Sequence, residues 1–520
     1  MLTVPQLKRA VADAIAYLRT VPDVQEAEVF MAANANLITR LAFTSHIPSN
    51  GVEEPKSNES FGVGLRVVFR DGGGIKQGFG SEPSDMTLAG VAQALDKARR
   101  GAVPDPEFVS LPRMGAKPRR SLIKYHDPAL MKLDDAGLVD LGWRVVDGAL
   151  EVFQSSEALL EWSRSPDTVK DLGLILTGDM MVIQERVAVG NTVEGAVIGD
   201  ETALISSVAT SMVERRNTKG TGWHVGGTLA GFGDGPGDDA ARNAIRAADG
   251  VRIPEGEYRV VLGPQPVTDI LNNLVLPGLS LGLFHAWASP FQGKLGKQIA
   301  SRTLSMYDHG ALRGLAASKG VTDEGLPTGR TDLIRHGRLV GLLANWYEHQ
   351  RALHDPEGAR KLGVDPNLYV AAIAPRNGFR FGMGGGRHFT QPPGIAATNV
   401  MVEGTEEVPT DELLRRVGDG IYIGRIWYTY PINGITQGDF TCTVIGDSYL
   451  IKDGRLGKPL QPNAVRLNDN THRILNGIIG IGREKKPTVV WNADEIVHAP
   501  EIAIESVAIN EVGDALMKGD

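Results

Sequence analysis

The chain has 520 residues and a formal net charge of −8, with 42% hydrophobic residues and a mean hydropathy of −0.12. This composition is that of a packed globular protein of about three domains, and it excludes wholesale disorder. The acidic balance gives no support for binding nucleic acid or an anionic membrane, and no apolar run is long enough for a transmembrane helix. Glycine, at 63 residues, indicates many turns.

The first region, residues 1–110, is predicted to be a small α/β domain. Its first helix begins with a capping box at Thr3 and Gln6, and charges at Lys8 and Arg9 argue against a signal peptide. The predicted elements are helices at 3–18 and 87–100 and strands at 27–32, 37–43, 61–69 and 75–79.

The middle region, residues 111–250, is predicted to hold one long helix and an antiparallel meander. Valine, isoleucine and threonine dominate its second half, as is typical of strands. The predicted elements are helices at 135–152 and 238–249, strands at 181–189, 192–198 and 203–213, and a glycine-rich loop at 220–237.

The third region, residues 251–520, is predicted to be a large β-rich domain, so that the whole chain has the α+β class. Hairpin turns are expected at His336-Gly337 and Asp453-Gly454, and short helices at 411–417 and 470–475. Cys442 lies in a predicted strand at 439–445 and is expected to be a buried hydrophobe. As the single cysteine, it excludes an intrachain disulfide, and we expect a cytoplasmic protein.

A common peptidase motif is absent from the chain. Zinc peptidases use two histidines on one helical face and a glutamate as the general base, as in HExxH or HExxxH. The dipeptide His-Glu does not occur. His349 and His354 have the HExxxH spacing, but Gln350 stands where the base should be, and a solvated polar stretch is the simpler interpretation.

A second candidate is the sequence GLSLG at 278–282, which matches a nucleophile elbow centred on Ser280. An elbow needs a strand entering it and a helix leaving it. Residues 274–276 are a candidate strand, although Pro277 weakens it. Asp323 and His388 follow in the order that a catalytic triad of this kind requires.

A third candidate is the glycine run at 382–386, which includes Gly385. A phosphate loop leads into a helix, but this run leads into Pro392 and Pro393, so a flexible loop bordering a cleft is the better interpretation. Arg387 and His388 would face a ligand carboxylate there.

Several further segments have a joint order and spacing that is more specific than any one of them. They are FGVGLRV at 61–67, SPFQGKLGKQIAS at 289–301, DEGLPT at 323–328, LIRHGRL at 333–339, TNVMV at 398–402, GIY at 420–422, GDF at 438–440 and YLIKDG at 449–454.

Together these segments resemble the TldD/PmbA family over most of the chain. The resemblance implies a cytoplasmic peptidase that acts on unfolded or modified peptides. In this family a TldD-type subunit bears HExxxH and zinc, and a PmbA-type (TldE) subunit does not. The resemblance also implies an N-terminal α/β domain, a middle element, a β-rich C-terminal domain and dimerisation around a cavity.

The chain departs from the zinc-bearing pattern of the family. Gapless alignment upstream of residue 289 places the two histidines on Asn272 and Pro277 and the glutamate on Asn273. The family's cysteine near the C-terminus has no counterpart at 482–491. We therefore expect no metal or other cofactor in this chain and zinc only in a TldD-like partner.

The preferred interpretation is a metal-free PmbA/TldE-like subunit that binds a peptide substrate and pairs with a zinc-bearing TldD-like subunit or with itself. One alternative is a non-catalytic homodimeric peptide-binding protein, and another is a serine hydrolase that uses Ser280. The catalytic candidates are Asp323, Glu324, His388 and Ser280, and the substrate-binding candidates are Arg387, Gly385 and Asp439.

Overall fold

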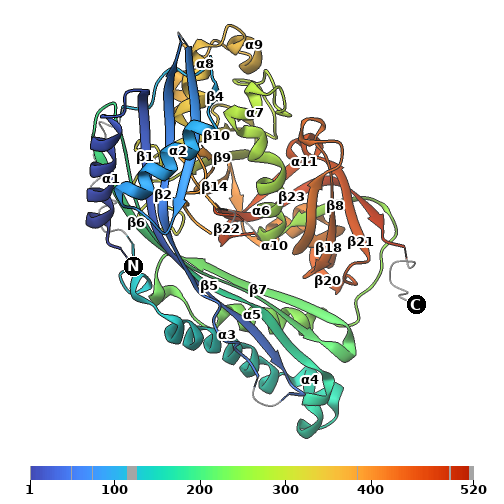
Figure 1. Cartoon of the computed structure of the whole chain (residues 1–520). Helices are drawn as coiled ribbons and strands as arrows, with labels where there is room; N and C mark the ends of the chain where they lie inside the picture. Colours follow the sequence, from blue (N-terminus) through green and yellow to red (C-terminus); the bar gives the residue numbers. More distant parts are fainter. Residues whose placement is uncertain are drawn as a thin grey trace.

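The fold was analysed in a computed structural model that describes residues 2–47, 50–72, 74–113, 126–382, 385–490 and 493–513. Helices and strands both contribute extensively, which confirms the predicted α+β class. Figure 1 shows a long twisted sheet on one side and a compact, strand-rich C-terminal domain on the other.

The N-terminal half is built on one antiparallel sheet with the strand order β4-β3-β2-β1-β5-β6-β7. Strands from both sides of the predicted boundary between residues 110 and 111 share this sheet. The boundary itself stays a prediction. The strands are β1 (Val24–Thr44), β2 (Asn58–Asp71), β3 (Gly74–Pro83), β4 (Val103–Pro104), β5 (Leu174–Asn191), β6 (Val197–Val213) and β7 (Thr218–Gly226).

The central strands are longer than the sequence predicts. The two strands expected at 27–32 and 37–43 form the single strand β1, because the polar Asn34 between them is satisfied. Its side chain donates to the carbonyl of Arg387 and accepts from the amide of Arg186. The strand predicted at 192–198 is mostly a turn, in which the Asn191 side chain accepts from the amides of Val193 and Glu194.

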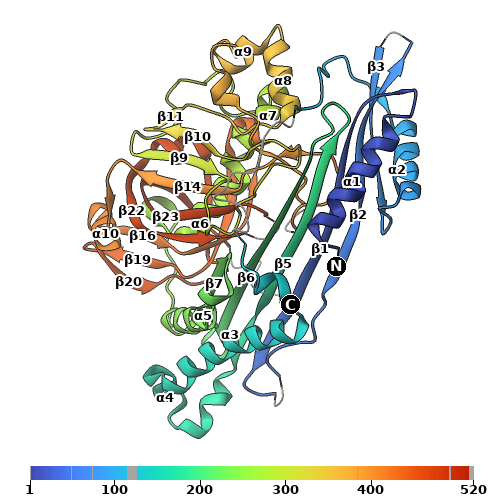
Figure 2. The same cartoon turned by 90° about the vertical axis from the view of Figure 1, so that its left-hand side faces the viewer.

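Two groups of helices cover one face of the sheet. Figure 2 shows the sheet between helices α1 and α2 and the C-terminal domain. α1 and α2 pack on the β1–β2 end, and α3 and α5 pack on the opposite end of the long strands. The prediction of a loop at 220–237 is wrong, because β7 and the start of α5 occupy much of this segment. The helices are α1 (Val4–Leu18), α2 (Leu88–Arg100), α3 (Asp135–Ser155), α4 (Glu157–Ser163) and α5 (Gly235–Arg246).

The C-terminal domain is centred on a second sheet of fourteen strands that mixes parallel and antiparallel pairs. Its strands are β8 (Gly256–Leu262), β9 (Leu304–His309), β10 (Arg330–Arg335), β11 (Arg338–Leu339), β14 (Asn399–Gly404), β15 (Glu407–Val408), β16 (Gly420–Ile423), β17 (Arg425–Pro431), β18 (Asp439–Gly446), β19 (Tyr449–Lys452), β20 (Arg455–Pro459), β21 (Val465–Asn470), β22 (Ile478–Thr488) and β23 (Ile496–Glu511).

Short elements complete this domain. β12 (Gly378–Phe379) and β13 (Gly394–Ile395) form a separate two-stranded sheet in the described part of the chain. The predicted turns at residues 336–337 and 453–454 join β10 to β11 and β19 to β20, which confirms both hairpins. The helices are α6 (Pro264–Ile270), α7 (Leu281–His285), α8 (Trp346–His354), α9 (Gly358–Leu362), α10 (Thr410–Val417) and α11 (Thr471–Asn476).

The second face of the long sheet is covered by the C-terminal domain. Phe30 and Ala32 of β1 and Val187 of β5 form one apolar cluster with Val321 and Phe389. The neighbouring β1 residues point to the opposite face, toward α1 and α2. Because both faces are covered, the middle of β1 is buried continuously instead of at every second residue.

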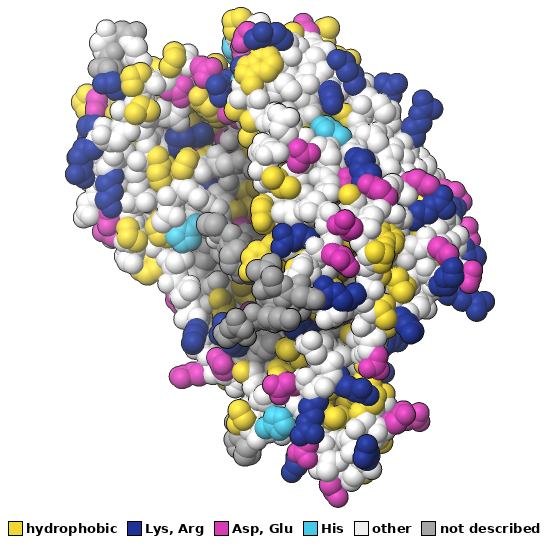
Figure 3. Space-filling model, turned by 90° about the vertical axis from the view of Figure 1, so that its right-hand side faces the viewer, with side chains coloured by type: hydrophobic (Ala, Val, Ile, Leu, Met, Phe, Trp, Pro, Cys, Tyr) yellow, Lys and Arg dark blue, Asp and Glu magenta, His cyan; other side chains and the backbone are white. Residues whose placement is uncertain are grey.

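No helix in the described part of the chain is long and apolar enough to cross a membrane. Figure 3 shows basic and acidic side chains interspersed over the face it presents, with hydrophobic side chains in small groups between them.

Close approach of the two halves depends on glycines in β2. A Cβ on Gly64 would lie 2.2 Å from the carbonyl oxygen of Phe389, which is backbone and cannot swing away. We expect Gly64→Ala to lower the free energy of unfolding by about 1–3 kcal/mol, as overpacking does. Urea unfolding measures this loss. Gly233→Ala is the control, because a Cβ there meets nothing within 4 Å; equal effects of both substitutions would contradict the packing argument.

Candidate functional site

The segment between β8 and β9 contains an unusual helix. α6 continues into a π-helical turn at Leu271–Val275, in which the amide of Leu276 donates to the carbonyl of Leu271 at 2.8 Å. A π-turn widens the helix, so positions five apart come to one side. Asn272 and Pro277 have this separation, and both line the same cavity.

This cavity, which we call the Glu495 cavity, has a volume of about 320 Å³. Its walls come from the π-turn and the two residues after it, the start of α7, Leu343, and the end of β13 with the two residues that follow it. Glu495 contributes the one acidic side chain of the lining. The lining residues are Asn272, Leu276, Pro277, Ser280, Leu283, Leu343, Ile395, Ala396, Ala397 and Glu495.

The Glu495 carboxyl has an altered proton affinity. Burial raises its pKa to about 7, and the carboxylates of Asp494 and Asp308 add to this rise. Hydrogen bonds to backbone amides offset the rise only in part. Glu495 therefore exchanges its proton near neutral pH, as functional carboxyls in cavities often do.

The cavity does not fit a zinc ion. Zinc takes thiolate, imidazole or carboxylate ligands. Asn272 is a neutral amide, Pro277 has no side-chain donor atom, and the described residues contain no group of three His, Cys, Asp or Glu suited to a metal. The Asn273 side chain is held by Asp269, to which its amide nitrogen donates.

Ser280 lies on the cavity wall but not on a nucleophile elbow. All residues from 264 to 285 are described and none is in a strand. The predicted strand at 274–276 is wrong, because the chain there stays helical through the π-turn and Pro277–Leu279. Asp323 accepts from the amide of Arg380, and His388 shares a hydrogen bond with the Thr390 hydroxyl, so neither hydrogen-bonds to Ser280.

Three of the other predicted site residues meet in a buried ion network between the two halves of the molecule. Asp323, Glu324 and Arg387 are each 0% exposed. The sheet contributes four partners and the C-terminal domain contributes five. The network comprises Glu28, Arg66, Glu185 and Asp200 from the sheet and Lys319, Asp323, Glu324, Arg380 and Arg387 from the C-terminal domain.

The network pairs charges across the interface. Arg387 lies 3.0 Å from Asp200 and 3.4 Å from Glu185. Lys319 donates to Glu185 at 2.6 Å, and these two cations outweigh the effect of burial and lower the pKa of Glu185 to about 2. This arrangement points to structural pairing rather than chemistry at a reacting group.

A second set of contacts in the network surrounds Arg66 and Arg380. Arg66 lies 2.8 Å from Glu28 and 3.5 Å from Glu324. Arg380 also binds Glu28 and stacks over Phe30 at 4.8 Å from the ring centre. Burial raises the pKa of Asp323 to about 6 and that of Glu324 to about 7, despite the neighbouring arginines.

The remaining predicted residues lie elsewhere. Gly385 donates to the carbonyl of Gly382 in a tight loop, and Gly386 donates to Asp494 at 2.8 Å, which brings this loop beside the segment that carries Glu495. His388 is partly buried and stacks on Phe389. Asp439 begins β18 and accepts from Asn470 at 2.9 Å.

Two other candidates have structural partners. Cys442 is buried, and burial raises the pKa of its thiol well above the usual range. His349 and His354 each direct Nδ1 to a backbone carbonyl, of Ile373 and Gln350 respectively.

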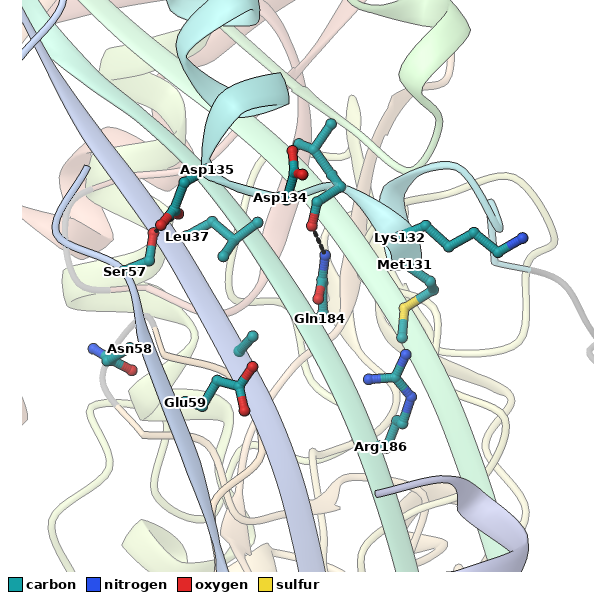
Figure 4. Close-up of a pocket in the computed structure, with 12 residues that line it drawn as sticks. Leu37, Ser57, Asn58, Glu59, Met131, Lys132, Asp134, Asp135, Gln184 and Arg186 are labelled. Carbon is teal, nitrogen blue, oxygen red and sulfur yellow. Dashed lines mark hydrogen bonds between the residues drawn. The ribbon is translucent and has the colours of Figure 1, made fainter. Parts of the chain in front are cut away.

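A second, more polar cavity of about 550 Å³ lies on the helix-covered face of the long sheet, between the two helix groups. Figure 4 shows Gln184 bonding the backbone beside Asp134, and Arg186 and Lys132 at one side. Glu59 and Asp135 supply acidic groups there, so the cavity carries charges of both signs.

Comparison with known proteins identifies the class. A family model for the C-terminal domain of PmbA/TldA metallopeptidases matches residues 255–511, and one for domain 1 of the same metallopeptidases matches residues 49–102. The chain therefore belongs to the PmbA/TldD family, a metallopeptidase-like family, as the sequence resemblance predicted.

Individual relatives agree with this family. The chain is 29% identical over 187 residues to metalloprotease slr0863 of Synechocystis, covering 36% of this chain and 34% of the relative. It is 27% identical over 224 residues to a metalloprotease TldD homolog of Haemophilus influenzae, covering 43% of this chain and 40% of the relative. The matched part thus spans less than half of either relative.

Solved structures share the fold. The TldE structure from Thermococcus kodakarensis superposes with a TM-score of 0.73 at 17% identity, covering 96% of this chain and 100% of that one. A Thermotoga maritima protein described as a modulator of a DNA gyrase gives 0.70 at 17% identity, covering 96% and 99%.

Glu495 was missed in the sequence because it stands in no motif. Asn272 and Pro277, which the sequence singled out, line the same cavity, but Glu495 is more than two hundred residues away from them in the chain. Only the folded chain brings the two segments together.

The buried position of Glu324 predicts a pH dependence. Its folded-state pKa, about 7, lies above its ordinary value of 4.5, so the folded chain holds a proton that the unfolded chain releases. The contribution of Glu324 to stability therefore falls as pH rises from about 4.5 to about 7. Glu324→Gln, whose amide oxygen still accepts from the Trp346 amide, should flatten the curve of unfolding free energy against pH in this window.

Urea unfolding at several pH values measures that slope. Glu161→Gln, at an exposed position of α4, should keep the wild-type slope. If the slope of Glu324→Gln also matches the wild type, the assignment is wrong.

Ser280 also generates a prediction. Because no strand presents its hydroxyl and both proposed triad partners bond elsewhere, a fluorophosphonate probe should not label it in the folded protein. Mass spectrometry of the probe-treated chain reads this out, with Ser280→Ala as the control for background; stoichiometric adduct on Ser280 would restore the serine-hydrolase alternative.

Proposed function

We propose that this chain is the metal-free, PmbA/TldE-type component of a cytoplasmic peptidase and acts with a zinc-bearing, TldD-like partner on unfolded or modified peptides. The observation that supports this most is the Glu495 cavity. The two positions aligned with the family's histidines share its wall, yet Asn272 and Pro277 cannot hold zinc.

The missing base strengthens the proposal. The family's glutamate aligns with Asn273, whose amide has no proton-accepting nitrogen and is engaged by Asp269. A chain without both the ligands and the base needs a partner to activate water. We assign no catalytic step to this chain.

Peptide binding by strand addition fits the surroundings of the cavity. Among the described residues β13 pairs with β12 alone, and the backbone that follows it, through Ala397, lines the cavity. A peptide added along this short strand would make main-chain hydrogen bonds, which tolerate many sequences, and would direct side chains toward the cavity.

Co-expression with an HExxxH-bearing relative tests the proposal. We expect a stable complex by size-exclusion chromatography, zinc in the complex at one equivalent per partner subunit, and peptide cleavage only by the complex. Zinc binding and cleavage by this chain alone would refute it.

The control for this experiment replaces the partner's glutamate of HExxxH with glutamine, which should abolish cleavage while the complex persists. A stable homodimer that binds peptides, with no complex and no cleavage, would favour the alternative of a non-catalytic binding protein.

A further inference from the structure

The Glu495 cavity contains an acidic group without a basic partner. In the described part of the chain, no lysine, arginine or histidine nitrogen lies within 4.0 Å of the Glu495 carboxylate. The acidic groups that act on it, Asp494 and Asp308, have the same sign. A partly enclosed carboxylate in this setting is stabilised by a cation from outside.

The other lining residues are of two kinds, polar and apolar. Asn272 and Ser280 are the polar ones, and their amide and hydroxyl oxygens can accept hydrogen bonds. The other lining side chains are apolar, among them Leu276, Leu283 and Leu343. Such a wall suits a ligand with an alkyl stem that ends in a charged head.

We propose that the Glu495 cavity recognises a primary ammonium group of the bound peptide, with Glu495 as its counter-ion. The ammonium comes either from a lysine side chain or from the peptide's amino terminus. This inference rests on the proposed peptide-binding function and adds its specificity.

The chemistry of the wall favours an ammonium over other cations. An ammonium has three donors, and Glu495, Asn272 and Ser280 offer one oxygen-bearing side chain each. A guanidinium also favours a flat aromatic surface on which to stack, and no aromatic side chain is among the residues that line this cavity. A volume of about 320 Å³ accommodates one long side chain, at the lower end of known ligand pockets.

The proton affinity of Glu495 predicts how this recognition depends on pH. Burial raises its pKa to about 7, so the carboxyl is mostly ionised at higher pH and mostly protonated at lower pH. An ammonium binds the ionised form. Affinity should therefore fall as the pH is lowered from about 8 to about 5.5.

Three labelled alanine pentapeptides test the proposal by fluorescence anisotropy on the isolated full-length chain. The first is acetylated and has a central lysine. The second is acetylated and has a central norleucine, which keeps the stem and removes the charge. The third has the same norleucine and a free amino terminus.

We expect the lysine peptide or the free-terminus peptide to bind about 10- to 100-fold more tightly than the acetylated norleucine peptide, as one charge-assisted hydrogen bond provides. Whichever of the two binds tightly identifies the source of the ammonium. Equal affinities for all three peptides, or no measurable binding of any, would overturn the proposal.

Glu495→Gln should remove the preference and its pH dependence, while Glu54→Gln, at an exposed loop position, should keep both. Thermal unfolding of both variants confirms that they are folded, and the wild-type pH profile gives a readout that needs no variant. A preference that survives in Glu495→Gln would also overturn the proposal.

The experiment uses no partner subunit and no cleavage readout. Failure to find a zinc-bearing partner would therefore refute the proposed function without changing the binding result, and loss of the ammonium preference would leave the partner experiment intact.

Discussion

The packing of the two halves depends on a buried ion network between the long sheet and the C-terminal domain. The network contains five carboxylates and four basic side chains. Removing such charges from water is costly, so each needs an opposite charge nearby, and several of these pairs, such as Arg387 with Asp200 and Lys319 with Glu185, join the two halves. Separating the two halves would leave charged side chains on each surface without their partners. A small shift of one half against the other would leave buried charges unpaired. The network therefore specifies one relative position of the two halves more strictly than the apolar cluster around Phe30 and Phe389 can.

This fixed position extends to the Glu495 cavity. Arg387 belongs to the network, Gly386 beside it donates to Asp494, and Glu495 is the next residue. The network is thus joined to the cavity by one hydrogen bond between residues adjacent in sequence to Arg387 and Glu495. The cavity wall opposite Glu495 comes from the π-turn, which is packed within the core of the C-terminal domain. The two sides of the cavity are therefore placed by core packing and by a hydrogen bond to the loop beside the network, and recognition by a few polar groups needs such positioning.

The spacing of hydrophobic residues predicted the helices and hairpins that local sequence determines. It failed for elements whose extent depends on contacts with distant parts of the chain. α1, α2, α3 and the hairpins at residues 336–337 and 453–454 follow local patterns, and the structure confirms them. The predicted break in β1 failed because Asn34 finds partners on a distant loop and on β5. The motif residues Asp323 and Glu324 are easily found in the sequence, but their burial against Arg387 and Arg66 depends on the sheet behind them. Glu495 has no local signal at all.

The π-turn at Leu271–Val275 makes the cavity sensitive to the length of this segment. A π-turn is equivalent to an α-helix with one residue inserted, and each residue of an α-helix advances by about 100°. Deletion of a single codon in this turn would rotate everything downstream, so Asn272 and Pro277 would no longer share a wall. The number of residues in this segment therefore matters to the cavity as much as the identity of its side chains, because a chain shortened by one residue here would keep every lining side chain and still lose the shared wall.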